Sequence, residues 1–252
     1  MNIAILVKQT PQVSEVTIDG KANWPESEVI VNPFDEYALE EALLLKEKHD
    51  GKTIAISFGT ENAQVALRSA LALGIDEAYL IVDPDYSYLD PQKAALALAK
   101  AIEKIGDIQM VLTGKQATDD DSALVAPAVA GYLDWPQTGF VKKFESAADD
   151  KVVALRSTDG GYDKVEVPLP AVFSVVKEIN EPRLPSLKGK MKAKKATITQ
   201  WTAADLGIEL KPMLTQKEMT APAARAAGEI LSGEKDEVIA KLVEKLKADQ
   251  VI

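Results

Sequence analysis

One stretch joins a short apolar run to a polar loop: Val111-Leu112-Thr113-Gly114-Lys115-Gln116-Ala117-Thr118-Asp119-Asp120-Asp121-Ser122. The apolar residues predict a strand that ends near Thr113, and the aspartates predict the start of a helix. In open α/β sheets, ligands bind where the strands end, and helix N-terminal amides suit a phosphate. The stretch lacks the spacing and second glycine of a Walker A loop, and it is no dinucleotide fingerprint. It predicts an anion-binding turn in an α/β fold.

The rest of the first half alternates short apolar runs with amphipathic stretches, which is typical of a parallel sheet covered by helices. The predicted strands are residues 3–7, 53–58, 78–82 and 109–113. The predicted helices are residues 35–48, 61–73, 91–105 and 121–132. Asn32 or Asp35 is expected to cap the first helix. We therefore predict the α/β class, with a parallel-sheet nucleotide-binding domain.

After about residue 138 the pattern changes to consecutive strands. They are predicted at residues 140–144, 152–155, 164–167 and 171–176, with Asp159-Gly160-Gly161 as a turn between two of them. These strands either extend the first sheet or pack beside it.

The C-terminal part of the chain consists of an aperiodic stretch followed by a predicted helix. Residues 196–230 show little periodicity and are read as an extended arm. The last helix is expected to be capped by Ser232 and to carry an apolar stripe of Val238, Leu242 and Leu246. It either wraps a partner or packs on its own domain. We divide the chain into an α/β domain, residues 1–195, and a C-terminal arm with an amphipathic helix, residues 196–252.

Residues 183–195 carry six cations and no acid in a protein of net charge −10. Pro182 and Pro185 keep the start of this run extended, so a helix is predicted only after Gly189. Apolar side chains stand between the cations: Leu184, Leu187 and Met191. A solvated basic linker and a surface that meets a partner both fit this pattern.

The composition excludes several kinds of site. There is no cysteine, so disulfides, thiolate metal sites and cysteine nucleophiles are absent. The acidic balance argues against nucleic-acid binding. His49 is the only histidine and lies at the expected end of a helix, so a serine triad has no candidate base. The consecutive Asp119, Asp120 and Asp121 fit helix capping better than a metal site. We expect no catalytic residue and no metal.

The N-terminal apolar stretch is too short for a signal peptide, and no run reaches the length of a membrane helix. We expect no membrane insertion and a cytoplasmic location, or the mitochondrial matrix in a eukaryote.

Four separated motifs stand in register over most of the chain. They are Asn32-Pro33-Phe34-Asp35-Glu36-Tyr37-Ala38-Leu39-Glu40-Glu41, Gly114-Lys115-Gln116-Ala117-Thr118-Asp119-Asp120-Asp121, Leu133-Asp134-Trp135-Pro136-Gln137 and the run that starts at Asn180. In this order they resemble the β subunit of electron transfer flavoproteins. The resemblance implies a fold like that of adenine nucleotide α-hydrolases, a buried AMP, and a heterodimer whose α subunit holds the FAD.

It also implies a carrier subunit rather than an enzyme. The pair would accept electrons from flavin dehydrogenases such as acyl-CoA dehydrogenase and pass them to a quinone oxidoreductase or another acceptor. Carried over by position, the cofactor-binding residues would be Leu6, Asn32, Pro33, Phe34, Asp35, Phe58, Gly59, Gly114, Lys115, Gln116, Ala117, Thr118, Asp119, Asp120, Asp121, Ser122, Ala123, Leu124 and Val125. Backbone amides from Gly114 onward and the Ser122 hydroxyl would hold the phosphate. Phe34 would approach the flavin, or else pack on the helix that follows it.

By the same resemblance, residues 183–195 correspond to the recognition loop that docks on dehydrogenases. Leu187 would be its hydrophobic anchor, supported by Met191, and the lysines would steer an acidic partner. The residues expected to dock are Arg183, Leu184, Leu187, Met191, Lys192 and Lys195.

The sequence departs from the family pattern at two places. Thr10-Pro11-Gln12 stand where Val-Pro-Asp often follows the first lysine, and Leu124 stands where Gln or Asn is common. Electron-bifurcating members, which carry a second FAD in place of AMP and oxidise NADH, typically have arginine at the position of Lys115 and a glycine in the aspartate run. Both features are absent here, which favours AMP. A stand-alone nucleotide-binding regulator of the stress-protein type is the third alternative.

Overall fold

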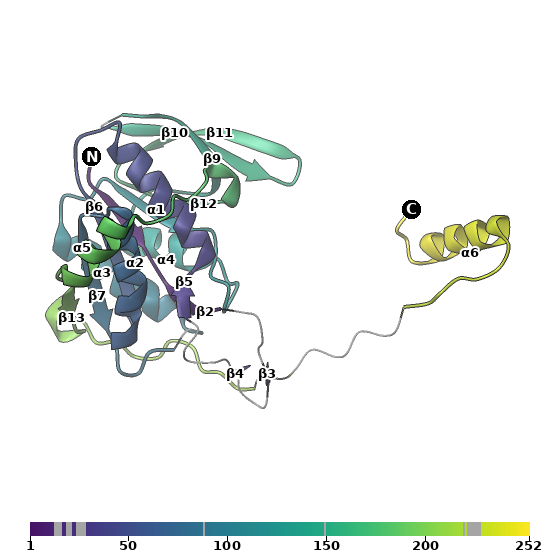
Figure 1. Cartoon of the computed structure of the whole chain (residues 1–252), viewed down its shortest axis with the longest axis horizontal. Coiled ribbons are helices and arrows are strands. Elements are labelled where there is room, and N and C mark those ends of the chain that lie inside the picture. Colours follow the sequence, from purple (N-terminus) through teal and green to yellow (C-terminus); the bar gives the residue numbers. More distant parts are fainter. Residues whose placement is uncertain are drawn as a thin grey trace. The chain divides into compact units, whose positions relative to one another are not determined.

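The computed structural model describes residues 1–12, 17–18, 22–23, 29–87, 89–148, 150–218, 220 and 228–252. The chain divides into two compact units, Met1–Met219 and Thr220–Ile252. Within the described residues, the first unit is built on a nine-stranded sheet of order β11-β10-β9-β12-β8-β1-β6-β7-β13 (Figure 1).

The centre of this sheet is parallel. Its strands are β1 (Ile3–Leu6), β6 (Thr53–Gly59), β7 (Glu77–Val82), β8 (Met110–Gly114) and β12 (Ala171–Val175). The covering helices are α1 (Pro33–Lys46), α2 (Gln64–Leu73), α3 (Pro91–Ile105) and α4 (Val125–Leu133). Ile3 and Ile5 pack in one core with residues of α1 and α2, whereas Ala4 and Leu6 pack in a second core with residues of α3 and α4. Both faces are covered, which explains why the strand sequences are apolar throughout.

The later strands extend this sheet. They are β9 (Gln137–Ala147), which is parallel to β12, followed by the antiparallel β10 (Lys151–Thr158) and β11 (Gly161–Pro168). Thr158 pairs with Gly161, so Asp159 and Gly160 form the predicted turn. The predicted fold class is confirmed, and the choice between extending the sheet and packing beside it is decided.

At the other edge, β13 (Thr199–Trp201) pairs in parallel with β7. The Trp201 ring packs on Tyr79 with centroids 4.8 Å apart, and Lys104 Nζ lies 4.8 Å from the Trp201 ring centroid. The prediction of an extended arm from residue 196 is therefore wrong for this part. Trp201 pairs in the sheet, although the sequence around it shows no periodicity that would predict a strand. The first compact unit continues to Met219 instead of ending at residue 195.

Shorter elements complete the description. They are β2 (Gln9–Pro11), β3 (Thr17–Ile18), β4 (Ala22–Asn23), β5 (Val29–Val31), the 3-10 turns η1 (Glu61–Ala63), η2 (Lys177–Ile179) and η3 (Ala204–Leu206), and the helices α5 (Leu187–Lys195) and α6 (Lys235–Ala248). None of the described helices combines the length and the apolar character that crossing a bilayer requires.

Several predicted helix starts are corrected. Helix α4 begins at Val125 rather than 121, because Asp121 and Ala123 adopt positive φ angles of 51° and 53° that no right-handed helix accommodates. Helix α5 begins at Leu187, before Gly189, because the Ser186 side chain accepts a hydrogen bond from Gly189 N–H at 3.0 Å.

In the second unit, the N-cap of α6 is Glu234, without a side-chain bond, and not the predicted Ser232. The predicted stripe of α6 is not buried: Leu242 is exposed, Val238 and Leu246 are half-buried, and no residue of this helix is buried. Lys245 forms an ion pair with Glu229 at 2.5 Å within the same unit.

Candidate functional site

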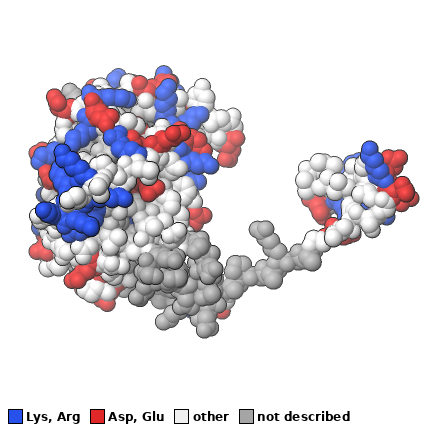
Figure 2. Space-filling model, viewed as in Figure 1, with Lys and Arg blue, Asp and Glu red and all other residues white. Residues whose placement is uncertain are grey.

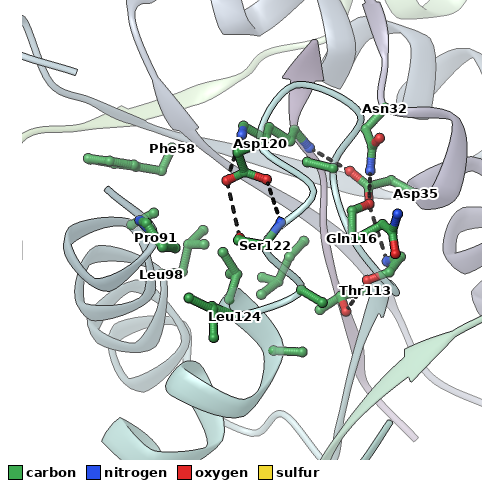
Figure 3. A pocket seen from close by; sticks show the side chains of 18 of the residues that line it. Asn32, Asp35, Phe58, Pro91, Leu98, Thr113, Gln116, Asp120, Ser122 and Leu124 are labelled. Atoms are coloured by element: carbon green, nitrogen blue, oxygen red, sulfur yellow. Dashed lines mark hydrogen bonds and ion pairs between the residues drawn. The ribbon is translucent and has the colours of Figure 1, made fainter. Parts of the chain in front are cut away.

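A pocket opens where β1, β6 and β8 end and where α3 and α4 begin. Figure 3 shows Phe58, Pro91 and Leu98 on one side of it and Asn32, Asp35 and Gln116 on the other. Its lining residues are Leu6, Val7, Lys8, Asn32, Asp35, Phe58, Tyr86, Ser87, Asp90, Pro91, Ala94, Leu98, Thr113, Gly114, Lys115, Gln116, Ala117, Asp120, Ser122, Ala123, Leu124, Val125 and Ala126. These residues form a largely apolar lining with a few polar groups, as is usual for a small-molecule site.

Asp35 ties three segments together at the polar side of the pocket. Its carboxylate accepts hydrogen bonds from Lys8 N–H at 2.8 Å, from Asn32 Nδ2 at 2.9 Å and from Gly114 N–H at 3.2 Å. Asn32 Nδ2 also donates to the Gln116 carbonyl at 2.9 Å. Asn32 occupies the N-cap position of α1 without a side-chain capping bond, so the predicted cap is wrong. Both side chains hold the loop after β8 instead.

Burial of the Asp35 side chain raises its pKa to about 7, and the three N–H donors and Lys8 only partly oppose this. The folded state therefore binds the Asp35 proton more tightly than the unfolded state, whose carboxyl has the ordinary value of 3.8. The stabilisation is fully present below about pH 4 and is lost as the pH rises through about 7.

We expect Asp35→Asn to change the pH dependence of stability. The amide lacks acceptors for all three donors, so the variant is less stable at low pH. This deficit in the free energy of unfolding should shrink by about 2 to 4 kcal/mol between about pH 4 and pH 8, because only the wild type carries the cost of ionising a buried carboxyl. Urea unfolding of both proteins across this range measures it. A deficit that stays constant with pH would contradict the raised pKa.

Gly114 lies where the chain leaves β8 and meets α1. A Cβ atom at this position would lie 2.6 Å from Asp35 Oδ1 and 2.6 Å from the carbonyl carbon of Phe34. Neither neighbour can withdraw, since one is backbone and the other is the buried carboxylate. Only glycine lets the loop after β8 approach the start of α1 this closely.

Lys8 forms ion pairs with the first two aspartates of the run 119–121. Its Nζ lies 2.7 Å from Asp119 Oδ1 and 3.6 Å from Asp120 Oδ2. Burial nevertheless raises the pKa of Asp119, with Lys8 opposing. The predicted role of the aspartates as caps of the next helix is wrong, because the positive φ angles delay α4 to Val125. Among the described residues, no group of three His, Cys, Asp or Glu could hold a metal ion.

Several amides of the loop after β8 already have acceptors within the chain, as that of Gly114 does. Thr118 N–H donates to Asn32 Oδ1 at 3.3 Å, and Ser122 N–H donates to Asp120 Oδ1 at 3.3 Å. The Ser122 hydroxyl donates to Asp120 Oδ2 at 3.3 Å, as Figure 3 shows. These groups are engaged in holding the loop.

The start of α4 offers amides of a different kind. The N–H groups of Val125 and Ala126 in its first turn have no acceptor within the helix, Pro127 has no N–H, and the N-cap Leu124 supplies no side-chain bond. Val125 and Ala126 at this position line the pocket. The helix dipole adds partial positive charge here. An anion in the pocket is therefore best accommodated at residues 123–126, further along the loop than Gly114.

The basic segment, residues 183–195, is held at its base by α1. Arg183 forms a two-pronged ion pair with the buried Glu40, with Nε and Nη2 each 2.8 Å from a carboxylate oxygen, and Nη1 lies 2.9 Å from Glu47 Oε1. Arg183, one of the predicted docking residues, is thus engaged within the chain. The apolar members Leu184, Leu187 and Met191 are 91%, 76% and 61% exposed.

Comparison with known proteins identifies the family. A family model described as the electron transfer flavoprotein domain matches residues 26–206. Over 100% of both chains, the sequence is 42% identical to the electron transfer flavoprotein subunit beta of Thermoanaerobacterium thermosaccharolyticum. This chain belongs to the electron transfer flavoprotein β subunits.

Two further relatives bear on the role of this β subunit. It is 37% identical to the electron transfer flavoprotein subunit beta of Bos taurus, over 97% of this chain and 93% of that one. It is 36% identical to the caffeyl-CoA reductase-Etf complex subunit CarD of Acetobacterium woodii, over 100% of both chains. As a β subunit of this family it is an electron carrier component and the partner of an α subunit.

The pocket of the β subunit has a wall that the sequence analysis missed. It comes from the segment after β7 and the start of α3: Tyr86, Ser87, Asp90, Pro91, Ala94 and Leu98. The Tyr86 ring packs edge-on against Phe58 with centroids 5.5 Å apart. Asp90-Pro91, an N-cap with proline in the first turn after a predicted strand, was the available signal. Val7, Thr113 and Ala126, each of which adjoins a predicted residue, were also missed, as was Lys8, two residues after Leu6.

Some predicted cofactor residues do not line the pocket: Pro33, Phe34, Gly59, Thr118, Asp119 and Asp121. Asp119 faces Lys8, and Gly59 packs toward Ala63, whose Cβ would lie 3.1 Å from a Cβ at residue 59. Lys115 Nζ lies 5.2 Å from the ring centroid of Phe34. A place in or beside a motif that lines the pocket therefore does not by itself put a residue on the pocket wall.

Proposed function

We propose that this β subunit binds AMP in the pocket and, with FAD held mainly by the α subunit, carries electrons from flavin dehydrogenases such as acyl-CoA dehydrogenase to a quinone oxidoreductase or another acceptor. The bound FAD supplies the redox chemistry. The residues of this chain bind the nucleotide and present a surface to the dehydrogenase. The location is proposed to be that of the dehydrogenases, the cytoplasm or the mitochondrial matrix.

The pocket itself is the observation that carries this proposal. Its apolar wall, with Leu6, Phe58 and Leu98, suits the flat face of a purine. The amides at the start of α4 suit a phosphate. Asp120 stands near them, and its ion pair with Lys8 reduces the repulsion that a phosphate would meet. A mononucleotide needs an apolar surface for its base and hydrogen-bond donors for its phosphate, and the pocket offers both.

The exposed apolar residues of the recognition loop support a transient encounter with a dehydrogenase. Leu187 and Met191 stand one helical turn apart on α5, among lysines. Figure 2 shows Lys and Arg gathered over the part of the surface where α5 lies in Figure 1. A small apolar anchor gives specificity, and the surrounding positive charge accelerates association with an acidic surface.

The nucleotides released on denaturation test the cofactor proposal. The β subunit is co-expressed with its α subunit, and the purified pair is denatured and analysed by chromatography and mass spectrometry. We expect one FAD and one AMP per heterodimer. A pair with FAD but without any adenosine monophosphate, or a β subunit that purifies alone and colourless, would contradict the proposal.

A second candidate is an electron-bifurcating subunit with its own FAD that oxidises NADH. The observation that favours it is the full-length similarity to CarD of a caffeyl-CoA reductase-Etf complex. Against it stand Lys115 and the uninterrupted aspartate run, whose first two members are held by Lys8. The same measurement separates the two candidates, because a bifurcating pair would release two FAD and no AMP.

A further inference from the structure

Apart from its Ser186 N-cap and the lysines of its last turn, helix α5 has few sequence features that stabilise a short helix. It has nine residues, whereas isolated helices shorter than about 12 residues are marginal in water. It contains Gly189, and its lysines repel at helical spacing, Lys188 with Lys192 and Lys190 with Lys194. We therefore expect the surface on which it lies to contribute to its helical form and to fix its position.

That surface is α2. A Cβ atom on Gly189 would collide with the carbonyl oxygen of Ala72 at the end of α2, so the two backbones are in close contact. One turn later, Ala193 is 3% exposed and faces the same way. Small residues at these two positions let α5 lie directly on α2, and this contact turns Leu187 and Met191 outward.

The end of α5 is held by an arginine of α2. Arg68 Nη1 donates to the carbonyls of Ala193 at 2.7 Å and Ala196 at 3.2 Å, with Lys194 at 3.4 Å. All side-chain hydrogen bonds that Arg68 donates within the described residues go to these carbonyls. They belong to the helix end, where carbonyls lack intrahelical partners and where a cation is favoured by the dipole.

Charge alone would not place Arg68 here, because it stands beside five lysines. All three contacts come from one guanidinium nitrogen, Nη1, whose two hydrogens are shared among the carbonyls, and the weakly hydrated guanidinium gives up less hydration for such contacts than the compact ammonium of a lysine. Arg68 is anchored on α2, whose neighbouring Leu67 is fully buried in the core. We infer that Arg68 is a positioning residue, which fixes α5 so that Leu187 is presented to the dehydrogenase. This inference rests on the proposed docking function.

The first test measures the helix directly. Arg68→Met in the full heterodimer should raise the rate of tryptic cleavage within residues 188–195 by about tenfold, because hydrogen bonds to a charged group are lost. Lys100→Met on α3 removes the same charge far from this site in sequence, and its cleavage rate should match the wild type. Cleavage of Arg68→Met at the wild-type rate would overturn the inference. If that variant does not assemble, Arg68→Lys is measured in its place. Its tryptic cleavage rate should lie above that of the wild type but below the tenfold increase, and a wild-type rate would overturn the inference.

The second test measures the consequence for docking. Reduction of the heterodimer by an acyl-CoA dehydrogenase with its acyl-CoA substrate should be about tenfold slower for Arg68→Met, while dithionite reduction and flavin content stay unchanged. In a Leu187→Ala background, Arg68→Met should have no further effect, since it acts through the same anchor. Independent, multiplying effects would overturn the inference. If Leu187→Ala itself has no effect, the docking proposal fails, and the cleavage rates still decide the role of Arg68 in holding α5.

Discussion

Gly114→Ala is expected to destabilise the first unit by about 3 kcal/mol and to release the nucleotide from the heterodimer. The added methyl group meets the carbonyl carbon of Phe34 and the carboxylate of Asp35, both at 2.6 Å. To relieve this overlap, the loop after β8 must move away from α1. The Asp35 bond to Gly114 N–H then breaks, and a buried carboxylate loses one of its donors. Urea unfolding and the AMP content of the purified pair measure the two effects.

Gly131→Ala is the matched control. Gly131 lies within α4, and a Cβ there meets no atom within 4 Å. This variant should keep its nucleotide and gain up to about 1 kcal/mol of stability, because alanine favours the helix. Equal behaviour of the two variants would show that the close approach of Gly114 to α1 is unimportant.

Leu187→Ala is expected to slow reduction by the dehydrogenase about 30-fold, the size of a central anchor in a small interface. Leu187 is 76% exposed and contributes little to the core, so heterodimer formation and flavin content should not change. Stopped-flow reduction by an acyl-CoA dehydrogenase, at low and high salt, measures the rate. The salt dependence should remain, because the lysines that steer association are still present.

Leu214→Ala provides the comparison for an exposed leucine outside the recognition loop. Leu214 is 51% exposed, and the heterodimer with Leu214→Ala should be reduced at a rate within twofold of the wild type. Loss of flavin in Leu187→Ala would place this leucine at the contact with the α subunit and would contradict its role in docking.

Much of the sheet could be predicted because strands buried on both faces must be apolar along their whole length. Residues 53–58 and 109–113 differ from β6 and β8 by one residue at the ends. The helix after β8 was placed four residues too early, because three aspartates resemble a cap. Backbone dihedrals decide that point: Asp121 and Ala123 turn left-handed, and the aspartates meet Lys8 instead.

Polar side chains were harder to interpret than apolar ones. Asn32 and Asp35 have the residue types and position of helix caps, yet they hold a loop that is about 80 residues away in sequence, as the bonds of Asn32 to Gln116 and Asp35 to Gly114 show. Arg183 belongs to the basic run that was expected to dock on a partner, yet it forms an ion pair with Glu40. A hydrogen bond needs a partner at a given distance and direction, and local sequence holds no record of a partner so far along the chain.

The sequence by itself determined the α/β class, the strand that ends near Thr113 with a polar loop after it, and a basic segment with apolar residues in it. Periodicity and composition carry these features, because they reflect which residues must avoid water. The tertiary structure alone decided that β13 joins the sheet, that α3 supplies one wall of the pocket, and that Arg68 and Gly189 seat α5 on α2. These depend on the close approach of segments distant in sequence, which only the packed chain brings together.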